Sequence, residues 1–207
     1  MANIIFDFDG TIADSLEAVG DIFYEMTRHR DLSDDEIAKL RQLSLRQIAK
    51  QLDVRWWQIP RLVMRGRKIM AERTDEIYIF KDMADVIKQL KAENHKLLII
   101  SSNSTTTIHS VLRRENLDKY FDKIYGGIGL FSKARSLRRI IWSNRLSRKT
   151  CFYIGDEERD IEASTRVGIH CIAVEWGFSD IKRLRELHPY GLAMQAKDIV
   201  KIINMNT

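Results

Sequence analysis

Hydrophobic positions along the chain alternate between short uninterrupted runs and segments with an apolar residue every three or four positions. An uninterrupted run is typical of a strand buried on both faces, and the wider spacing is typical of a helix with one buried side. The runs predict strands over residues 3–8, 96–100, 123–126, 150–154 and 170–175. The spaced segments predict helices over residues 83–90, 106–116, 134–143 and 161–167. This alternation predicts an α/β fold with a Rossmann-like parallel sheet covered by helices on both faces.

The segment over residues 15–79 shows only the helical spacing. Its first stripe predicts a helix from Ser15 to about residue 30 and consists of Leu16, Val19, Ile22, Phe23 and Met26. Ser33 with Glu36 three residues later matches a capping box that opens the next helix. Further helices are expected over residues 45–52 and 60–74. We therefore expect a helical cap at residues 15–79, inserted after the first strand into a core formed by residues 1–14 and 80–207.

Polar residues follow directly on several predicted strands. They are Asp7, Asp9, Ser101, Ser102, Asn103, Gly155 and Asp156. The carboxyl ends of parallel strands share one edge of a sheet, and ligands of open α/β sheets bind at that edge. The sequence therefore predicts a binding site there.

Composition limits the class of protein. The chain has 207 residues, of which 44% are hydrophobic and 30% are charged, which is typical of one globular domain with a modest insertion. No apolar stretch reaches the length of a membrane span, and Asp7 and Asp9 stand where a signal peptide would be apolar, so we expect a cytoplasmic protein. Cys151 and Cys171 lie in apolar runs, which predicts two buried reduced thiols.

The basic residues are unevenly distributed. The net charge is +5, and no acidic residue occurs between Asp122 and Asp156, whereas that stretch holds Lys133 and several arginines. A solvated basic helix face is the favoured interpretation, because no nucleic-acid-binding motif accompanies the charge. A surface for nucleic acid or a partner protein stays open as the alternative. The segment Gly126-Gly127-Ile128-Gly129 lacks the pattern of a nucleotide-binding loop and is interpreted as a flexible connector.

The acidic residues point to a cation. Asp7 and Asp9 are two residues apart on an extended chain, so both carboxylates face the same side. Close carboxylates repel each other unless a cation lies between them, and Mg²⁺ prefers such oxygen ligands. Asp156 after another predicted strand supplies a third carboxylate.

These motifs resemble those of the haloacid dehalogenase superfamily. The chain contains Asp7-Phe8-Asp9-Gly10-Thr11, a strand ending at Ser101, Lys133, and Gly155-Asp156 with Asp160, in the family's order. The helical insertion lies where the family's small cap domain lies. The residues Asp14-Ser15 and Trp176-Gly177-Phe178 are similar to the branch that contains phosphoglycolate phosphatases, and the chain also resembles β-phosphoglucomutases.

The resemblance implies a role for each of these positions. Asp7 is the candidate nucleophile and Asp9 the acid and base, which agrees with the chemistry open to two carboxyl groups. Mg²⁺ is expected on Asp7, the main-chain carbonyl of Asp9, and Asp156. In the family pattern Lys133 bridges the nucleophile and the phosphate. Asp160 is expected to orient Lys133 or metal-bound water, or to cap the helix that follows it.

Phosphate binding is expected at the ends of two predicted strands. The candidate residues are Gly10, Thr11, Ser101, Ser102, Asn103 and Lys133. Donors between a strand and a helix N-terminus suit an anion.

Substrate choice is expected to lie in the insertion. Residues 41–46 resemble the family's specificity loop, with Arg41 and Arg46 as candidates, although Gln42 stands where relatives usually have glycine. Trp56 and Trp57 are either a ligand-facing surface or packing residues.

The expected function is Mg²⁺-dependent hydrolysis of a small phosphomonoester, phosphoglycolate-like or a sugar phosphate, through an aspartyl phosphate. We expect a small phosphorylated metabolite as the partner, and neither a membrane nor a nucleic acid. The alternatives are a phosphomutase of the same family and a non-catalytic binding protein that uses the basic surface.

Overall fold

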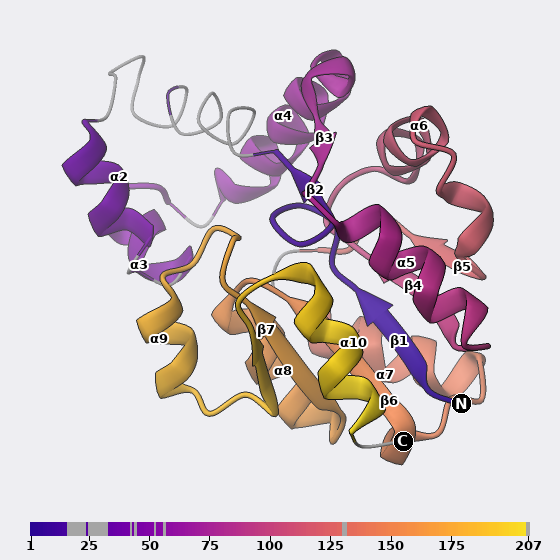
Figure 1. Ribbon diagram of the computed structural model, residues 1–207. Coiled ribbons are helices and arrows are strands. Elements are labelled where there is room, and N and C mark those ends of the chain that lie inside the picture. Colours follow the sequence, from indigo (N-terminus) through magenta and orange to yellow (C-terminus); the bar gives the residue numbers. More distant parts are fainter. Residues whose placement is uncertain are drawn as a thin grey trace.

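The computed structural model describes residues 1–15, 24, 33–41, 43, 45–51, 53–55, 57–129 and 132–205. These residues build a six-stranded sheet with the order β5-β4-β1-β6-β7-β8, and all neighbouring strands are parallel (Figure 1). Its strands are β1 (Asn3–Phe6), β4 (Lys96–Ile100), β5 (Lys123–Tyr125), β6 (Cys151–Gly155), β7 (His170–Val174) and β8 (Gly191–Ala193). The predicted parallel α/β sheet is therefore confirmed.

The strand order reverses direction at β1. From β1 the chain adds β4 and β5 on one side, and it then returns to add β6, β7 and β8 on the other. In an open parallel sheet the crevice at such a reversal, outside the carboxyl ends of the strands, is where ligands bind. The boundary between β1 and β6 is therefore the place to look for a site.

Helices cover both faces of the sheet, because alternate residues of each strand point to opposite sides. Ile4 and Phe6 of β1 belong to one hydrophobic core, and Ile5 between them belongs to the other. The first core is covered by α5 (Met83–Ala92), α6 (Thr105–Arg114) and α10 (Ala196–Asn204). The second is covered by α7 (Lys133–Ser143), α8 (Glu158–Val167) and α9 (Ile181–Glu186). Cys151 and Cys171 are both buried and free, as the sequence predicts.

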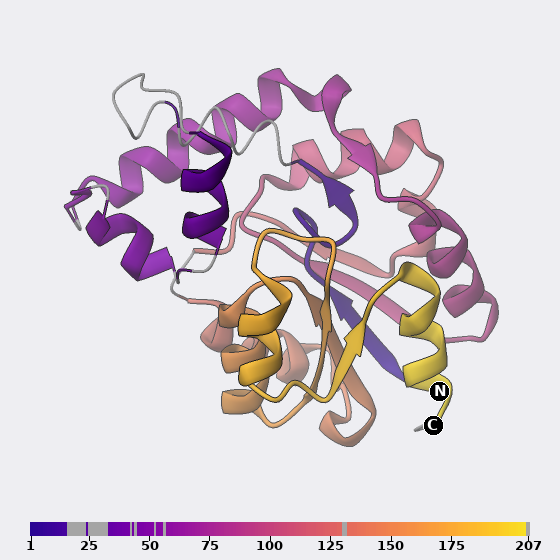
Figure 2. The ribbon, with the colours of Figure 1, turned by 60° about the vertical axis from the view of Figure 1, so that its left-hand side comes forward.

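The described part of the insertion lies on the side toward which β1 points (Figures 1 and 2). It is bounded by β2 (Ala13–Asp14) and β3 (Tyr78–Ile79), which pair antiparallel. Between them the described residues form α2 (Asp34–Arg41), α3 (Leu45–Gln51), α4 (Ile59–Glu72) and the 3₁₀ turn η1 (Thr74–Glu76). Most of the predicted helix from Ser15 to residue 30 lies outside the described residues.

The predicted capping box at the start of α2 is confirmed. The Glu36 side chain accepts a hydrogen bond from the Ser33 amide at 3.0 Å, and the Glu36 amide donates to Ser33 Oγ at 3.4 Å. Both bonds satisfy amides that have no partner in the first turn of a helix.

Several elements were missed in the sequence. No element was assigned after residue 175, yet β8, α9 and α10 complete the fold. β8 has three residues and β2 and β3 have two each, which is too short for a periodic pattern. Their pairing depends on neighbours distant in the sequence.

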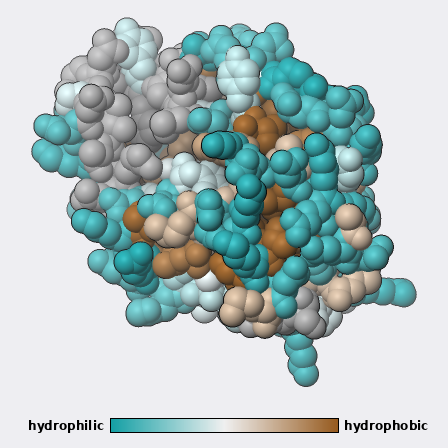
Figure 3. All heavy atoms as spheres, viewed as in Figure 1, coloured by the Kyte–Doolittle hydropathy of each residue, from teal (hydrophilic) through white to brown (hydrophobic). Residues whose placement is uncertain are grey.

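Hydrophilic residues predominate on the face shown in Figure 3, and apolar residues show between them in small patches. Among the described residues, no helix has the length and apolar character needed to cross a membrane.

One buried histidine connects the start of the chain to β4. His95 is 5% exposed, and its Nδ1 accepts a hydrogen bond from the Ala2 amide at 2.9 Å. An accepting Nδ1 carries no proton. Burial, only partly opposed by the Glu93 carboxylate, lowers the pKa of His95 below 6.5.

This environment predicts a stability that depends on pH. The unfolded chain binds a proton at His95 more readily than the folded protein, so folding free energy is lost as the pH falls below 6.5, by at most about 1.4 kcal/mol per pH unit. His95→Asn keeps an acceptor without a titrating group, and its stability should fall less between pH 7.5 and 5.5. Urea unfolding at both pH values measures this difference. The exposed His188→Asn is the control, and an acid loss in His95→Asn equal to that in the wild type would contradict the prediction.

Candidate active site

Two neighbouring strands deliver the central carboxylates. Asp7 follows β1, Asp156 follows β6, and the two strands are paired with Phe6 opposite Ile154. The amide of Asp7 donates to the carbonyl of Ile154 at 2.8 Å, so the pairing extends one residue beyond β1. The two carboxylates therefore lie side by side at the edge where the strand order reverses.

A third carboxylate joins them from α8. Single oxygen atoms of Asp7, Asp156 and Asp160 lie within 4.8 Å of one another, and all three residues are buried. Burial raises the pKa of Asp7 to about 6 despite the opposing charge of Lys133. Burial first, and then the carboxylates of Glu157, Asp160 and Asp7, raise the pKa of Asp156 well above its usual range. The ionised form of this group is therefore costly unless a cation lies close by.

The cluster fits a hard divalent cation. Its donors are all carboxylate oxygens, which are the ligands that Mg²⁺ prefers. Of the predicted metal residues, Asp7 and Asp156 belong to the cluster, and the Asp9 carboxylate is turned to other partners. Asp9 is expected to bind the metal through its main-chain carbonyl, which leaves its side chain available for a different task.

Lys133 lies at the first position of α7 and is 5% exposed. Its Nζ donates to Asp7 Oδ2 at 2.6 Å and also contacts Asp160 Oδ1. Burial disfavours the ammonium, but the charges of Asp160 and Asp7 outweigh it and raise the pKa of Lys133 above its usual value. The lysine therefore stays charged and fixes one oxygen of Asp7.

Asp160 contacts Lys133 and also takes part in a helix cap. One of its oxygens contacts Lys133, and the other accepts a hydrogen bond from the Glu157 amide at 3.0 Å. The second bond is half of a capping box at the start of α8. The same residue thus caps the first turn of the helix and contacts the lysine.

Asp9 has neutral hydrogen-bond donors around its carboxyl group. It accepts from Ser15 Oγ at 3.1 Å, Ser101 Oγ at 3.3 Å and Asn103 Nδ2 at 3.2 Å. Burial raises the pKa of Asp9, and these hydrogen bonds only partly oppose it. Among the described residues Asp9 forms no ion pair, and a carboxyl group with a raised pKa in such surroundings is suited to giving and taking a proton.

Two backbone amides at this edge of the sheet, one after β1 and one in the loop after β4, are available to a ligand. Within the described part of the chain, the N–H groups of Asp9 and Ser102 have no hydrogen-bond partner. The loop leads into α6, where Ser104 caps the helix by accepting from the Thr107 amide at 3.0 Å. Amides at the start of a helix form a site for an anion.

The glycine-rich segment after β5 is not the flexible connector expected from the sequence. The Gly127 amide donates to the Asn103 carbonyl at 2.6 Å, and the Ile128 amide donates to the Ser101 carbonyl at 3.0 Å. Gly127 has a φ of 72°, a left-handed conformation that glycine adopts without strain. The segment therefore supports the loop after β4.

Gly10 and Thr11, expected to bind phosphate, contact Asp156. Thr11 Oγ1 donates to Asp156 Oδ1 at 2.9 Å. A Cβ at Gly10, whose φ is +73°, would lie 2.3 Å from Asp156 Oδ2, so only glycine fits there. Both residues hold this carboxylate in place.

The segment after β7 contributes contacts that sequence reasoning missed. The Phe178 amide donates to Asp156 Oδ2 at 2.8 Å, and a Cβ at Gly177 would lie 2.1 Å from Asp156 Cβ. Trp176 Nε1 donates to the Thr11 carbonyl at 3.1 Å. The only signal in the sequence was the family resemblance of residues 176–178, which did not indicate that they contact Asp156.

The predicted residues of the insertion are only partly placed. Arg41 ends α2 and Arg46 lies in α3, but their side chains are outside the described part of the structure. Trp56 also lies outside it. Trp57 is exposed, and the guanidinium of Arg55 lies 5.3 Å from the centre of its ring.

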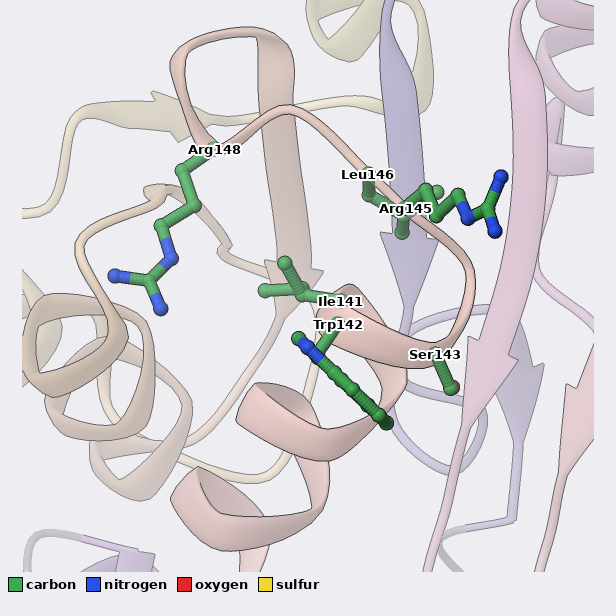
Figure 4. A pocket seen from close by; sticks show the side chains of 6 residues that line it. All are labelled: Ile141, Trp142, Ser143, Arg145, Leu146 and Arg148. Carbon is green, nitrogen blue, oxygen red and sulfur yellow. The ribbon is translucent and has the colours of Figure 1, made fainter.

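A cavity of about 600 Å³ lies apart from this site (Figure 4). It is lined by Ile141, Trp142, Ser143, Arg145, Leu146 and Arg148. These residues stand at and after the carboxyl end of α7, whereas Lys133 stands at its amino end. The cavity is therefore not part of the carboxylate cluster.

Known proteins are similar to this chain in sequence and in fold. Residues 4–174 match the family model described as haloacid dehalogenase-like hydrolase. A phosphoglycolate phosphatase from Synechococcus elongatus is 33% identical over 98% of this chain and 97% of that protein. A 5'-nucleotidase from Pseudomonas aeruginosa is 24% identical over 90% of this chain and 88% of that protein.

A solved structure titled as a predicted phosphatase from Clostridium acetobutylicum has a TM-score of 0.84 at 20% identity and covers 99% of both chains. This likeness shows the fold, and the family match spans the strands that carry Asp7, Ser101 and Asp156. The resemblance seen in the motifs is thereby confirmed, and the chain belongs to the haloacid dehalogenase-like hydrolase family.

Proposed function

We propose that this enzyme is a Mg²⁺-dependent phosphatase that hydrolyses a small phosphomonoester through a phosphorylated Asp7. The observation that carries the proposal is the contrast between two carboxyl groups two residues apart. Burial raises the pKa of both groups, but Asp7 is held by the Lys133 ammonium in a cluster of carboxylates, whereas Asp9 is held by neutral donors. One group is suited to attack and the other to proton transfer.

The first step forms a bond between an Asp7 oxygen and phosphorus and breaks the bond from phosphorus to the alcohol oxygen. The Asp7 carboxylate is already oriented, because Oδ1 accepts from the Phe8 amide at 2.7 Å and Oδ2 from Lys133. Protonated Asp9 gives its proton to the departing alcohol. The ionised Asp9 then takes a proton from the water that attacks phosphorus, which releases phosphate and restores both groups.

The charge of the phosphoryl group requires donors and cations around it. The N–H groups of Asp9 and Ser102 and the Lys133 ammonium are proposed to supply them. When bound to Asp7, the Asp9 carbonyl and Asp156, Mg²⁺ would neutralise charge between the nucleophile and the phosphate. Gly10 and Thr11 are proposed to act through Asp156, which they contact.

The substrate proposal is a small phosphoester of the phosphoglycolate type or a sugar phosphate. It is supported by the relative named phosphoglycolate phosphatase, whose match extends over nearly the whole of both chains. Residues 15–79 are proposed to act as a cap that covers the leaving group and excludes water, since β2 and β3 join them to the core beside the site. A phosphomutase remains the alternative within the family.

Asp7→Asn should abolish turnover and keep the fold, because the amide has the shape of the carboxylate and is not a nucleophile. The measurement is phosphate release from phosphoglycolate, sugar phosphates and nucleotides, with Mg²⁺ and with EDTA. Chelation should stop the wild type as completely as the substitution does. The exposed Asp85→Asn on α5 is the control and should retain full activity.

Activity that survives in Asp7→Asn would contradict the nucleophile assignment. A wild type without metal-dependent turnover on any of these compounds would instead favour the phosphomutase or the binding-protein alternative.

Asp9→Asn should have an effect that depends on the leaving group. An alkoxide leaves poorly without a proton, so hydrolysis of an alkyl phosphate should fall about 10²- to 10⁴-fold. p-Nitrophenolate leaves without protonation, so the first step with p-nitrophenyl phosphate should be slowed far less. A rapid-mixing burst of p-nitrophenol that persists in Asp9→Asn, followed by slow turnover, is the expected result. Equal losses of the first step for both substrates would contradict the proton-transfer role.

A further inference from the structure

A cation from the insertion contacts the loops that carry the proposed chemistry. Arg67 lies in α4 and is half-buried. Its Nε donates to the Ser102 carbonyl at 2.8 Å, and its Nη2 lies 3.5 Å from the Ile128 carbonyl. The first acceptor is in the loop after β4, and the second is in the loop after β5 that leads to Lys133.

The contact with Ser102 supplies the donor for one of three successive carbonyls in the loop after β4. The carbonyl of Ser101 accepts from the Ile128 amide and that of Asn103 accepts from the Gly127 amide. The carbonyl between them, on Ser102, accepts from Arg67. All three successive carbonyls therefore have a donor, and the middle donor is the one supplied by the insertion.

The residues held in this way contact Asp9. Ser101 Oγ and Asn103 Nδ2 both donate to the Asp9 carboxyl group. Between them, the Ser102 N–H has no acceptor in the part of the chain that the structure describes. The Ser102 carbonyl shares its peptide with the Asn103 amide, which donates to Ser101 Oγ at 2.9 Å, so a rotation of this peptide would release the hydroxyl that contacts Asp9. The direction of the Ser102 N–H depends on the preceding peptide, which Ile128 holds.

A second arginine connects the insertion to α6, the helix that follows the loop after β4. Arg114, at the far end of α6, donates to the Thr74 carbonyl at 2.9 Å and also contacts the Ile77 carbonyl, where the insertion returns to the core. α6 begins at the loop that Arg67 contacts. The position of α4 and the position of this loop are thus connected at both ends of α6.

We propose that Arg67 is a positioning residue that fixes the phosphate-binding loop only when α4 lies against the core. The inference rests on the proposed function, in which this loop receives the phosphoryl group. Arg67 acts through carbonyl oxygens, so its contribution is directional and does not require contact with the substrate. By linkage, an anion that binds the ordered loop also favours the docked position of α4.

The test compares Arg67→Ala with Lys68→Ala, which removes the same charge at an exposed position of the same helix. Charge-assisted hydrogen bonds of this kind predict that the inhibition constant of inorganic phosphate and the KM of the substrate rise together, roughly 10- to 100-fold, in Arg67→Ala. Lys68→Ala should stay within about twofold of the wild type. Methylguanidinium in the assay should restore part of the loss in Arg67→Ala, because it can donate to the same carbonyls.

Hydrogen exchange separates a positioning role from a general loss of stability, because it compares the same variant with and without phosphate. Phosphate with Mg²⁺ should slow amide exchange over residues 59–72 in the wild type and not in Arg67→Ala. Arg67→Lys, which keeps one donor in a less fixed geometry, should be intermediate, and it serves as the test variant if Arg67→Ala does not fold.

Unchanged phosphate inhibition and unchanged KM in Arg67→Ala, in an active wild-type background, would overturn the positioning role and leave the phosphatase proposal standing. Lower activity with unchanged phosphate affinity would also overturn it. If the wild type releases no phosphate from any ester, the proposed function fails. Phosphate affinity measured by calorimetry with Mg²⁺ then still tests the loop.

Discussion

The ammonium group of Lys133, buried against Asp7 and Asp160, is the contact on which the geometry of the site depends. Three buried carboxylates and one ammonium leave two negative charges without a partner inside the cluster. Such an imbalance is costly in a protein interior, and burial first, with the neighbouring carboxylates second, raises the pKa values of Asp7 and Asp156. A divalent cation removes the imbalance, which is why the cluster fits Mg²⁺. The lysine keeps Asp7, the proposed nucleophile, oriented, and Asp160, which holds the lysine, also caps the start of α8.

The sheet makes this arrangement possible because its order reverses between β4 and β6, with β1 in the centre. Asp7 follows the central strand, so it is adjacent to Asp156 on one side and to the loop with Ser101 on the other. Glycine at positions 10 and 177 lets two further segments approach Asp156 more closely than any side chain would allow. The path of the backbone therefore brings the residues of the site together.

The strands and the main site residues were predictable because their signals are local. Uninterrupted apolar runs marked five of the six strands, and Asp7, Ser101 and Asp156 follow directly on such runs. What escaped the sequence depends on contacts between distant residues. The hydrogen bond from Phe178 to Asp156, the pairing of β7 with β8, and the bond from Arg67 to Ser102 each join residues whose proximity only the folded chain creates. The glycine-rich segment was misinterpreted for the same reason, since its partners lie in another loop.

Phosphorylation of Asp7 is the step from which the rest of the proposed reaction follows, and it can be detected by trapping the intermediate. The enzyme is mixed with substrate and Mg²⁺, quenched in acid after milliseconds, and reduced with sodium borohydride, which converts an aspartyl phosphate to homoserine. Mass spectrometry of the N-terminal tryptic peptide then locates the change. Homoserine is expected at position 7 and not at position 9, and only when substrate is present. Turnover without any conversion at Asp7, or with conversion at a different aspartate, would contradict it.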